Sequence, residues 1–146
     1  MSEQDRVQLP APGWEPLTEG YWFAAGHGNF VVQKCRDCGT HRWPPAWVCY
    51  ACQSMNWDWD ELPGRGTVFS YTWADQRPVG DLPLYNISVV QLDATHGEPV
   101  RLMTRVVDVD KGKLRVGLPV EVTFEPFDDE VAIPFFKPRD EATWTA

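Results

Sequence analysis

The sequence predicts a mainly β protein: a short N-terminal helix, a four-cysteine metal-binding ribbon and a five-stranded antiparallel barrel. Three observations predict this class. All four cysteines lie in two Cys-x-x-Cys pairs within 35–52, and a single stretch near the N terminus has helical spacing. The residues after the ribbon form short apolar and β-branched runs separated by turns. We therefore divide the chain into a lead and helix (1–28), a ribbon (29–63) and a barrel with a C-terminal tail (64–146).

The helix is expected from Glu15 to Ala25, after a polar, proline-containing lead. Its apolar stripe consists of Trp14, Leu17, Tyr21 and Trp22. Gly26-His27-Gly28 supplies a stop signal. Gly20 disfavours a longer helix, because glycine costs free energy in a helix interior. A strand over 29–34 is expected next, running into the first cysteine pair.

The two cysteine pairs, Cys35 with Cys38 and Cys49 with Cys52, are separated by ten residues and predict a metal site. Each short pair can direct two thiolates at one ion, and the loop returns the second pair to complete a tetrahedron. Gly39 directly follows the first pair, where such a turn often needs positive φ. Two disulfides are the alternative, but a polar, acidic N terminus without a secretory signal fits them poorly. Zinc is the expected metal, with iron as its rival. Four protein ligands leave no open position for water, so we interpret the site as structural.

The rest of the ribbon is predicted from proline, glycine and alternation. Pro44 and Pro45 fix φ in the loop between the cysteine pairs and predict an extended connector. Residues 57–62 alternate aromatic and acidic side chains, as a half-buried strand does. The Pro63-Gly64-Arg65-Gly66 stretch interrupts this pattern, and we place the boundary between ribbon and barrel there.

Five later runs are predicted as strands: 67–73, 85–92, 100–107, 120–124 and 131–136. In the fourth run, Val120, Val122 and Phe124 alternate with polar residues and are expected to face inward. Pro134 in the last run suits an edge strand. Short strands joined by turns, with no helix long enough for a crossover, indicate a small antiparallel barrel. A five-stranded OB-fold fits this count.

Charge and composition exclude some functions and favour others. The net charge of −8 argues against binding nucleic acid, because a nucleic-acid binder needs a positive excess to replace counterions. No apolar run approaches the length of a membrane span, so we expect a cytoplasmic protein. Eight tryptophans exceed what a small domain buries completely, which indicates apolar surface covered by a partner or ligand.

Aromatic side chains in three places are candidates for that partner or substrate surface. They are Phe69, Tyr71 and Trp73 on one predicted strand, Trp43 and Trp47 in the ribbon loop, and Phe135 and Phe136 near the C terminus. The strand group is first interpreted as barrel core, with a wall for an apolar ligand as the alternative. The ribbon-loop pair lies where its own small ribbon cannot bury it deeply, which favours interface anchors. The C-terminal pair precedes basic residues and is expected at the barrel edge or against a partner.

The sequence contains no catalytic constellation of its own. His27, His41 and His96 fall in predicted turns and loops, where solvated histidines are the common case. Neither a Gly-x-Ser-x-Gly elbow nor a glycine-rich phosphate-binding motif occurs. The acidic clusters at 58–61 and 128–130 are interpreted as solubility features of an acidic protein. We therefore expect no catalytic residue in this chain.

The order of modules and several local motifs resemble the DUF35 family, which joins a rubredoxin-like zinc ribbon to an OB-fold and is associated with acyl-CoA enzymes. The matching segments are 30–39, Pro44-Pro45, 49–52, Trp59, 64–72 and 118–122. The resemblance covers nearly the whole chain, about residues 14–137. One departure is Gln53 after the second cysteine pair, where many relatives have glycine. All four metal ligands are nevertheless present.

The resemblance implies an accessory subunit that acts beside a thiolase-fold enzyme in a hetero-oligomer. One branch of the family partners a thiolase-like aldolase that cleaves a steroid-CoA side chain, releasing propionyl-CoA and a 17-ketosteroid. The catalytic groups are then expected on the partner chain. The alternatives are a stand-alone acyl-CoA or lipid carrier, a single-strand nucleic-acid binder that stacks bases on the barrel aromatics, and an electron carrier with iron in the four-thiolate site.

Overall fold

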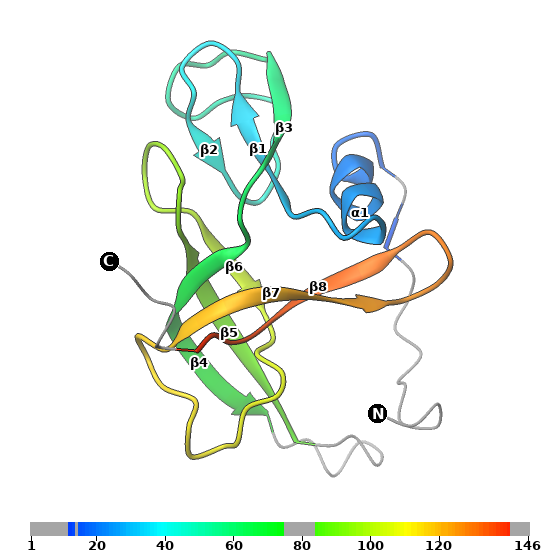
Figure 1. The fold of residues 1–146 in the computed structure, drawn as a ribbon. Helices are drawn as coiled ribbons and strands as arrows, with labels where there is room; N and C mark the ends of the chain where they lie inside the picture. Colours follow the sequence, from blue (N-terminus) through cyan, green and yellow to red (C-terminus); the bar gives the residue numbers. More distant parts are fainter. Residues whose placement is uncertain (1–11, 14, 75–83, 141–146) are drawn as a thin grey trace.

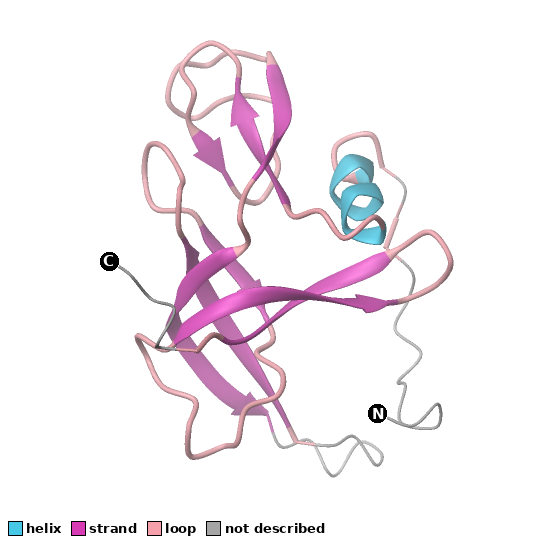
Figure 2. Cartoon of the chain, viewed as in Figure 1, coloured by secondary structure: helices cyan, strands magenta, loops and turns pink. Residues whose placement is uncertain are grey.

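The computed structural model describes residues 12–13, 15–74 and 84–140 and confirms a mainly β fold with one short helix (Figures 1 and 2). The elements are α1 (Glu19–Gly26), β1 (Val31–Cys35), β2 (His41–Arg42), β3 (Trp57–Glu61), β4 (Arg65–Ala74), β5 (Tyr85–Leu92), β6 (Arg101–Thr104), β7 (Pro119–Pro126) and β8 (Ala132–Pro138). They form two antiparallel sheets, with α1 beside them (Figure 1). No helix in these ranges is long and apolar enough to cross a bilayer.

The smaller sheet forms the upper lobe in Figure 1, with strand order β2-β1-β3. β1 pairs with β3 along its whole length, from Val31 opposite Glu61 to Cys35 opposite Trp57. The first cysteine therefore stands at the end of a strand, as the sequence predicts. This pairing fixes where the metal-binding loops leave the sheet.

The larger sheet has the order β6-β5-β4-β7-β8 and curls into a half-barrel, as expected for an OB-fold. The long central strand β4 pairs with β5 over most of its length but with β7 only at Arg65–Thr67. The far edge strand β8 returns toward β6, where Val106 and Phe136 form a parallel bridge. This bridge brings the two ends of the curled sheet together.

One apolar cluster joins the helix, the base of the ribbon and the inside of the barrel. Phe30 packs edge-to-face on Phe136 with ring centroids 5.8 Å apart, and Phe136 is fully buried. Val32 and Leu62 belong to the same cluster from the ribbon side. Burial of such side chains is the main force that stabilises the fold.

The helix begins at Glu19, four residues later than the sequence suggests, because the residues from Glu15 form a turn instead. Its position depends on Gly20. A Cβ on this residue would lie 2.2 Å from Nε1 of Trp59, so only glycine allows α1 to approach β3 this closely. Tyr21 then enters the core cluster.

Candidate metal centre and partner surface

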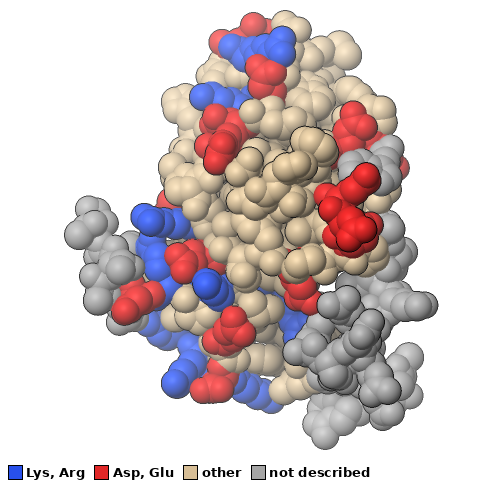
Figure 3. Space-filling model, turned by 45° about the vertical axis from the view of Figure 1, so that its right-hand side comes forward, with Lys and Arg blue, Asp and Glu red and all other residues tan. Residues whose placement is uncertain are grey.

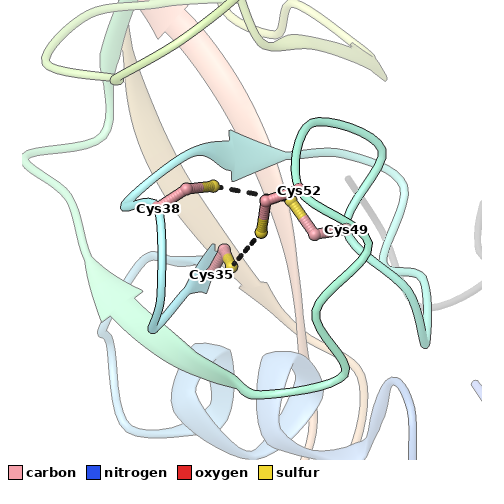
Figure 4. A group of neighbouring side chains, drawn as sticks. All are labelled: Cys35, Cys38, Cys49 and Cys52. Atoms are coloured by element: carbon pink, nitrogen blue, oxygen red, sulfur yellow. Dashed lines mark hydrogen bonds between the residues drawn. The ribbon is translucent and has the colours of Figure 1, made fainter.

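The four cysteine sulfurs converge at the tip of the ribbon (Figure 4). All Sγ atoms lie within 4.8 Å of one another, and the Cys35–Cys52 and Cys38–Cys49 pairs are each 3.6 Å apart. A tetrahedron with metal–sulfur bonds of 2.3 Å has sulfur–sulfur edges of about 3.8 Å. The spacing therefore fits one shared ion. All four cysteines are free thiols, so the predicted disulfide alternative does not occur.

The two cysteine pairs form equivalent turns. The N–H of Gly39 donates to the carbonyl of Cys35 at 3.0 Å, and the N–H of Gln53 donates to Cys49 at 2.9 Å. Both turn residues have positive φ, 75° for Gly39 and 64° for Gln53. The left-handed conformation predicted for Gly39 is confirmed. Gln53 adopts it too, at a cost of about 1–2 kcal/mol for a residue with a side chain.

Polar contacts favour the thiolate form of Cys38, and further polar contacts hold the metal-binding loops. Side-chain and backbone hydrogen bonds with Thr40 lower the pKa of Cys38 to about 6, so that its sulfur is ready to ligate a metal near neutral pH. Arg36 donates two hydrogen bonds to Asp58 on β3. Asp37 accepts hydrogen bonds from Ser54 and Asn56 in the second metal-binding loop. The two loops are thus tied to each other and to the sheet.

His41 joins the ribbon to the barrel. It is buried on β2, where its Nδ1 accepts the N–H of His96 at 2.8 Å and its Nε2 donates to Asp60 at 2.7 Å. Gly97, next to His96, has φ of 96°, and a Cβ there would lie 2.8 Å from Thr40. The expectation of a solvated loop histidine is wrong for His41. The contact spans 55 residues, so no local pattern reveals it.

Of the aromatic candidates on β4, two are exposed. Phe69 is 45% exposed and Tyr71 is 39% exposed, whereas Trp73 packs against the core cluster. The core interpretation is therefore wrong for Phe69 and Tyr71. For Phe69, a register shift between Val68 and Ser70 breaks the strand alternation on which this interpretation depended. Tyr71 pairs with the buried Ser88 on the core face, but the core leaves it partly uncovered. The ring of Phe69 instead lies under the guanidinium of Arg101, 3.9 Å from ring centroid to Cζ.

The aromatic candidates of the ribbon loop and of β8 also divide into exposed and buried side chains. Trp47 is 52% exposed, but Trp43 is half-buried against Tyr21 of α1, at a ring distance of 4.6 Å. Helix α1 covers Trp43, whereas the prediction considered burial by the ribbon alone. Phe136 is buried in the barrel and forms no surface, while Phe135 is half-buried. The candidate partner surface is reduced to the exposed Trp47, Phe69 and Tyr71, while Trp43, Trp73 and Phe135 are half-buried.

Further exposed apolar side chains accompany these three. They are Phe23, Val48, Tyr50, Met55, Leu84, Ile87, Met103 and Val116. No local sequence pattern identifies them, because exposure depends on what the tertiary fold leaves uncovered. Figure 3 shows a broad area without charged side chains over the upper and central part of the molecule in that view. Depletion of charged side chains is a feature of the centre of protein interfaces.

Two family models match the chain in succession. Residues 22–58 match "ChsH2, rubredoxin-like zinc ribbon domain", and residues 59–125 match "ChsH2, C-terminal OB-fold domain". The chain belongs to the ChsH2 (DUF35) family. This confirms the resemblance seen in the sequence. Within the described residues, the four cysteines are the only group of three or more His, Cys, Asp or Glu side chains placed to hold a metal, which agrees with a ribbon of this family.

Solved structures support the same assignment. A structure described as "Ltp2-ChsH2(DUF35) aldolase" superposes with a TM-score of 0.77 at 31% identity, covering 88% of this chain and 98% of that chain. A DUF35 protein of unknown function from Sulfolobus solfataricus has a TM-score of 0.56 at 16% identity, covering 93% of this chain and 91% of its own. This second likeness shows the fold alone.

The curated relatives that the chain matches are longer proteins. A probable enoyl-CoA hydratase alpha subunit from Thermomonospora curvata is 36% identical over 81% of this chain and 36% of its own length. The 3-oxo-4,17-pregnadiene-20-carboxyl-CoA hydratase alpha subunit of Mycobacterium tuberculosis is 28% identical over 77% of this chain and 35% of its own length. The chain thus spans about a third of each.

Proposed function

We propose that this chain is an accessory subunit that binds and completes a thiolase-like retro-aldolase. The enzyme would cleave the side chain of a steroid-CoA ester to a 17-ketosteroid and propionyl-CoA. The observation that carries this proposal is the match to the chain in the Ltp2-ChsH2(DUF35) aldolase, of which 98% is covered at 31% identity. The name of that complex couples a ChsH2 chain with a second protein in one aldolase.

The surface of the chain supports a contribution through binding rather than through a reactive group. Trp47, Phe69 and Tyr71 expose aromatic area that a partner or an apolar substrate would cover. A rigid apolar wall excludes water and positions a large substrate, and both effects accelerate a reaction without donating a proton or nucleophile. We place the catalytic groups on the partner.

We further propose that Cys35, Cys38, Cys49 and Cys52 hold zinc in a structural role. The mutual spacing of the thiols supports a tetrahedral ion, and four protein ligands leave no position for a reacting water. Elemental analysis of the purified chain tests the choice of metal. About one zinc per chain is expected, whereas a red protein containing iron would overturn it.

The functional proposal is tested with a tagged chain used to recover its partner from native extract. The partner, expressed alone and together with this chain, is then given a β-hydroxyacyl steroid-CoA, and propionyl-CoA and the 17-ketosteroid are followed by mass. We expect cleavage only when both chains are present. Full activity of the isolated partner would exclude an accessory role.

The names of the curated relatives favour a second candidate, a hydratase subunit. The two reactions are chemically consecutive, because adding water to an α,β-unsaturated acyl-CoA gives the β-hydroxyacyl-CoA that a retro-aldolase cleaves. Offering the complex an unsaturated steroid-CoA separates them. A hydratase adds the mass of water to this substrate, whereas an aldolase leaves it unchanged and cleaves only the hydrated form.

A stand-alone carrier would instead bind acyl-CoA in the absence of any partner.

A further inference from the structure

A pocket of about 230 Å³ lies where the ribbon loop meets the loop between β5 and β6. In Figure 1 this second loop stands beside β2. The pocket walls are largely apolar, and two charged residues line them as well. Its principal lining residues are Arg42, Val48, Tyr50, Glu98, Pro99 and Val100.

Arg42 is a buried cation with neutral partners. Its side chain is only 5% exposed, its Nε donates to Oε1 of the fully buried Gln33, and its Nη2 donates to the carbonyl of Ala46 at 2.9 Å. Its Nη1 has no hydrogen-bond partner among the described residues. A buried guanidinium is costly unless an acceptor, preferably an anion, satisfies each N–H group.

The pocket mouth is exposed and apolar. Val48 is 46% and Tyr50 56% exposed, and both line the pocket. Trp47 and Met55, on the same loop, are also exposed. An apolar rim around a buried polar group is the arrangement found where one partner side chain inserts into another protein.

We propose that this pocket receives an acidic side chain of the partner subunit, whose carboxylate pairs with the guanidinium of Arg42, a lining residue with only neutral hydrogen-bond partners. Apolar groups beside that carboxylate would cover Val48 and Tyr50. The inference rests on the proposed function, since it requires a partner. To that function it adds two details: the surface of this chain that the partner contacts, and the charge of the side chain that the partner inserts.

The size and charge of the pocket favour a carboxylate over the phosphates of CoA. A pocket of about 230 Å³ is smaller than the range of about 300–1,000 Å³ usual for small-molecule ligands, but it accommodates one side chain. CoA carries several phosphate charges, whereas the pocket offers a single guanidinium with Glu98 nearby. One cation beside one carboxylate suits a singly charged group.

A charge-reversal pair at the pocket mouth tests the sign of the inserted group. The probe is the thiolase-fold subunit that co-purifies with the tagged chain, expressed separately and titrated against the whole chain. We expect Val48→Asp to weaken binding by about tenfold through repulsion, and Val48→Lys to leave it unchanged or tighter. Val116→Asp is the matched control, because Val116 is an exposed valine outside the pocket lining. Equal effects of the two Val48 substitutions would overturn the proposal.

Two further variants test the buried charge. Arg42→Met, checked for fold and metal content, should weaken binding by about thirtyfold or more, and Glu98→Gln should tighten it by about two- to fivefold. Free CoA that binds the isolated chain and loses this binding in Arg42→Met would assign the pocket to a phosphate and overturn the partner carboxylate. If no thiolase-fold subunit binds the wild-type chain, the proposed function itself fails. Binding that none of these variants changes leaves the function intact and excludes the pocket.

Discussion

The ribbon tip and the barrel are stabilised by different means. The barrel encloses large apolar side chains from every strand of its sheet, including Val68, Val90, Leu102, Val120 and Phe136. At the ribbon tip the buried groups are Cys35 and Cys49, while the aromatic side chains near them are half-buried or exposed. The barrel thus depends on apolar burial, and the tip depends on its ligand set.

This difference explains how a small domain can leave apolar side chains on its surface. A metal that joins four side chains replaces the apolar core that a loop of this length cannot form, so its aromatic residues are free to face outward. The base of the ribbon behaves differently, because Phe30, Val32 and Leu62 belong to the same cluster as the barrel. Removing the metal should therefore separate the tip from the rest of the molecule.

The largest expected effect is that of Cys49→Ser or of a strong chelator. Apparent binding free energies for structural zinc in small peptides are of order 10–16 kcal/mol, so the tip should unfold when a ligand is lost. The barrel should keep its slow amide exchange, because its core contains none of the ligands. Hydrogen exchange by residue measures both parts in one sample.

The matched control for this comparison is Met55→Ser, which changes a residue of the same loop that is 68% exposed and is not a ligand. It should retain the metal and the tip. Loss of barrel protection together with tip protection after metal removal would show one cooperative unit and contradict the comparison.

The second effect tests the barrel. Phe136 is fully buried and packs on Phe30, so Phe136→Ala should lower the free energy of unfolding by about 3–5 kcal/mol. Its neighbour Phe135 is half-buried, and Phe135→Ala should cost clearly less. Denaturant unfolding measures the difference. Equal losses for the two phenylalanines would show that the burial pattern of β8 does not hold in solution.

The features predicted correctly from the sequence are those that depend on the spacing of neighbouring residues. The cysteine pairs, the positive φ of Gly39 and most strands follow from patterns only a few residues long. Phe69 was misassigned because a bulge between Val68 and Ser70 changes which face of the sheet it occupies, whereas Tyr71 lies opposite the buried Ser88 and is exposed because the core does not extend over it. A bulge inserts one residue into one strand, and periodicity read from that strand alone does not reveal it.

The contacts that position the candidate sites could not be predicted. The buried role of His41 depends on a backbone group 55 residues away. Arg42 sits in a β2 strand of only two residues, where no hydrophobic period can be recognised. Gly20 is unfavourable in a helix by propensity alone, and only its close approach to Trp59 explains why a glycine is needed at this position. In each case a distant residue determines the environment.

The third effect concerns the contact between α1 and the ribbon. Gly20→Ala should cost about 1–3 kcal/mol, because the new Cβ would lie 2.2 Å from Nε1 of Trp59 and force the helix outward. Gly112→Ala is the control, since a Cβ there meets nothing within 4 Å. Thermal unfolding and tryptophan emission measure the two variants. If alanine at 20 is as harmless as alanine at 112, close approach of α1 is not needed for stability.

The smallest effect is electrostatic and lies at the ribbon tip. Two hydrogen bonds from Arg36 and its positive charge lower the pKa of Asp58. A carboxyl whose pKa is lower in the folded state adds stability above its unfolded pKa of about 3.9, and this contribution is lost as the pH falls through the folded value. Asp58→Asn should therefore melt slightly below wild type at pH 7 in low salt. The two should converge in 1 M salt, and also as the pH falls below the lowered pKa of Asp58. Asp110→Asn, which removes the exposed partner of Lys113, should change the melting temperature still less, because that pair is longer, at 3.7 Å. A deficit in Asp58→Asn that persists unchanged in 1 M salt would mean that Asp58 holds the tip by packing rather than by charge.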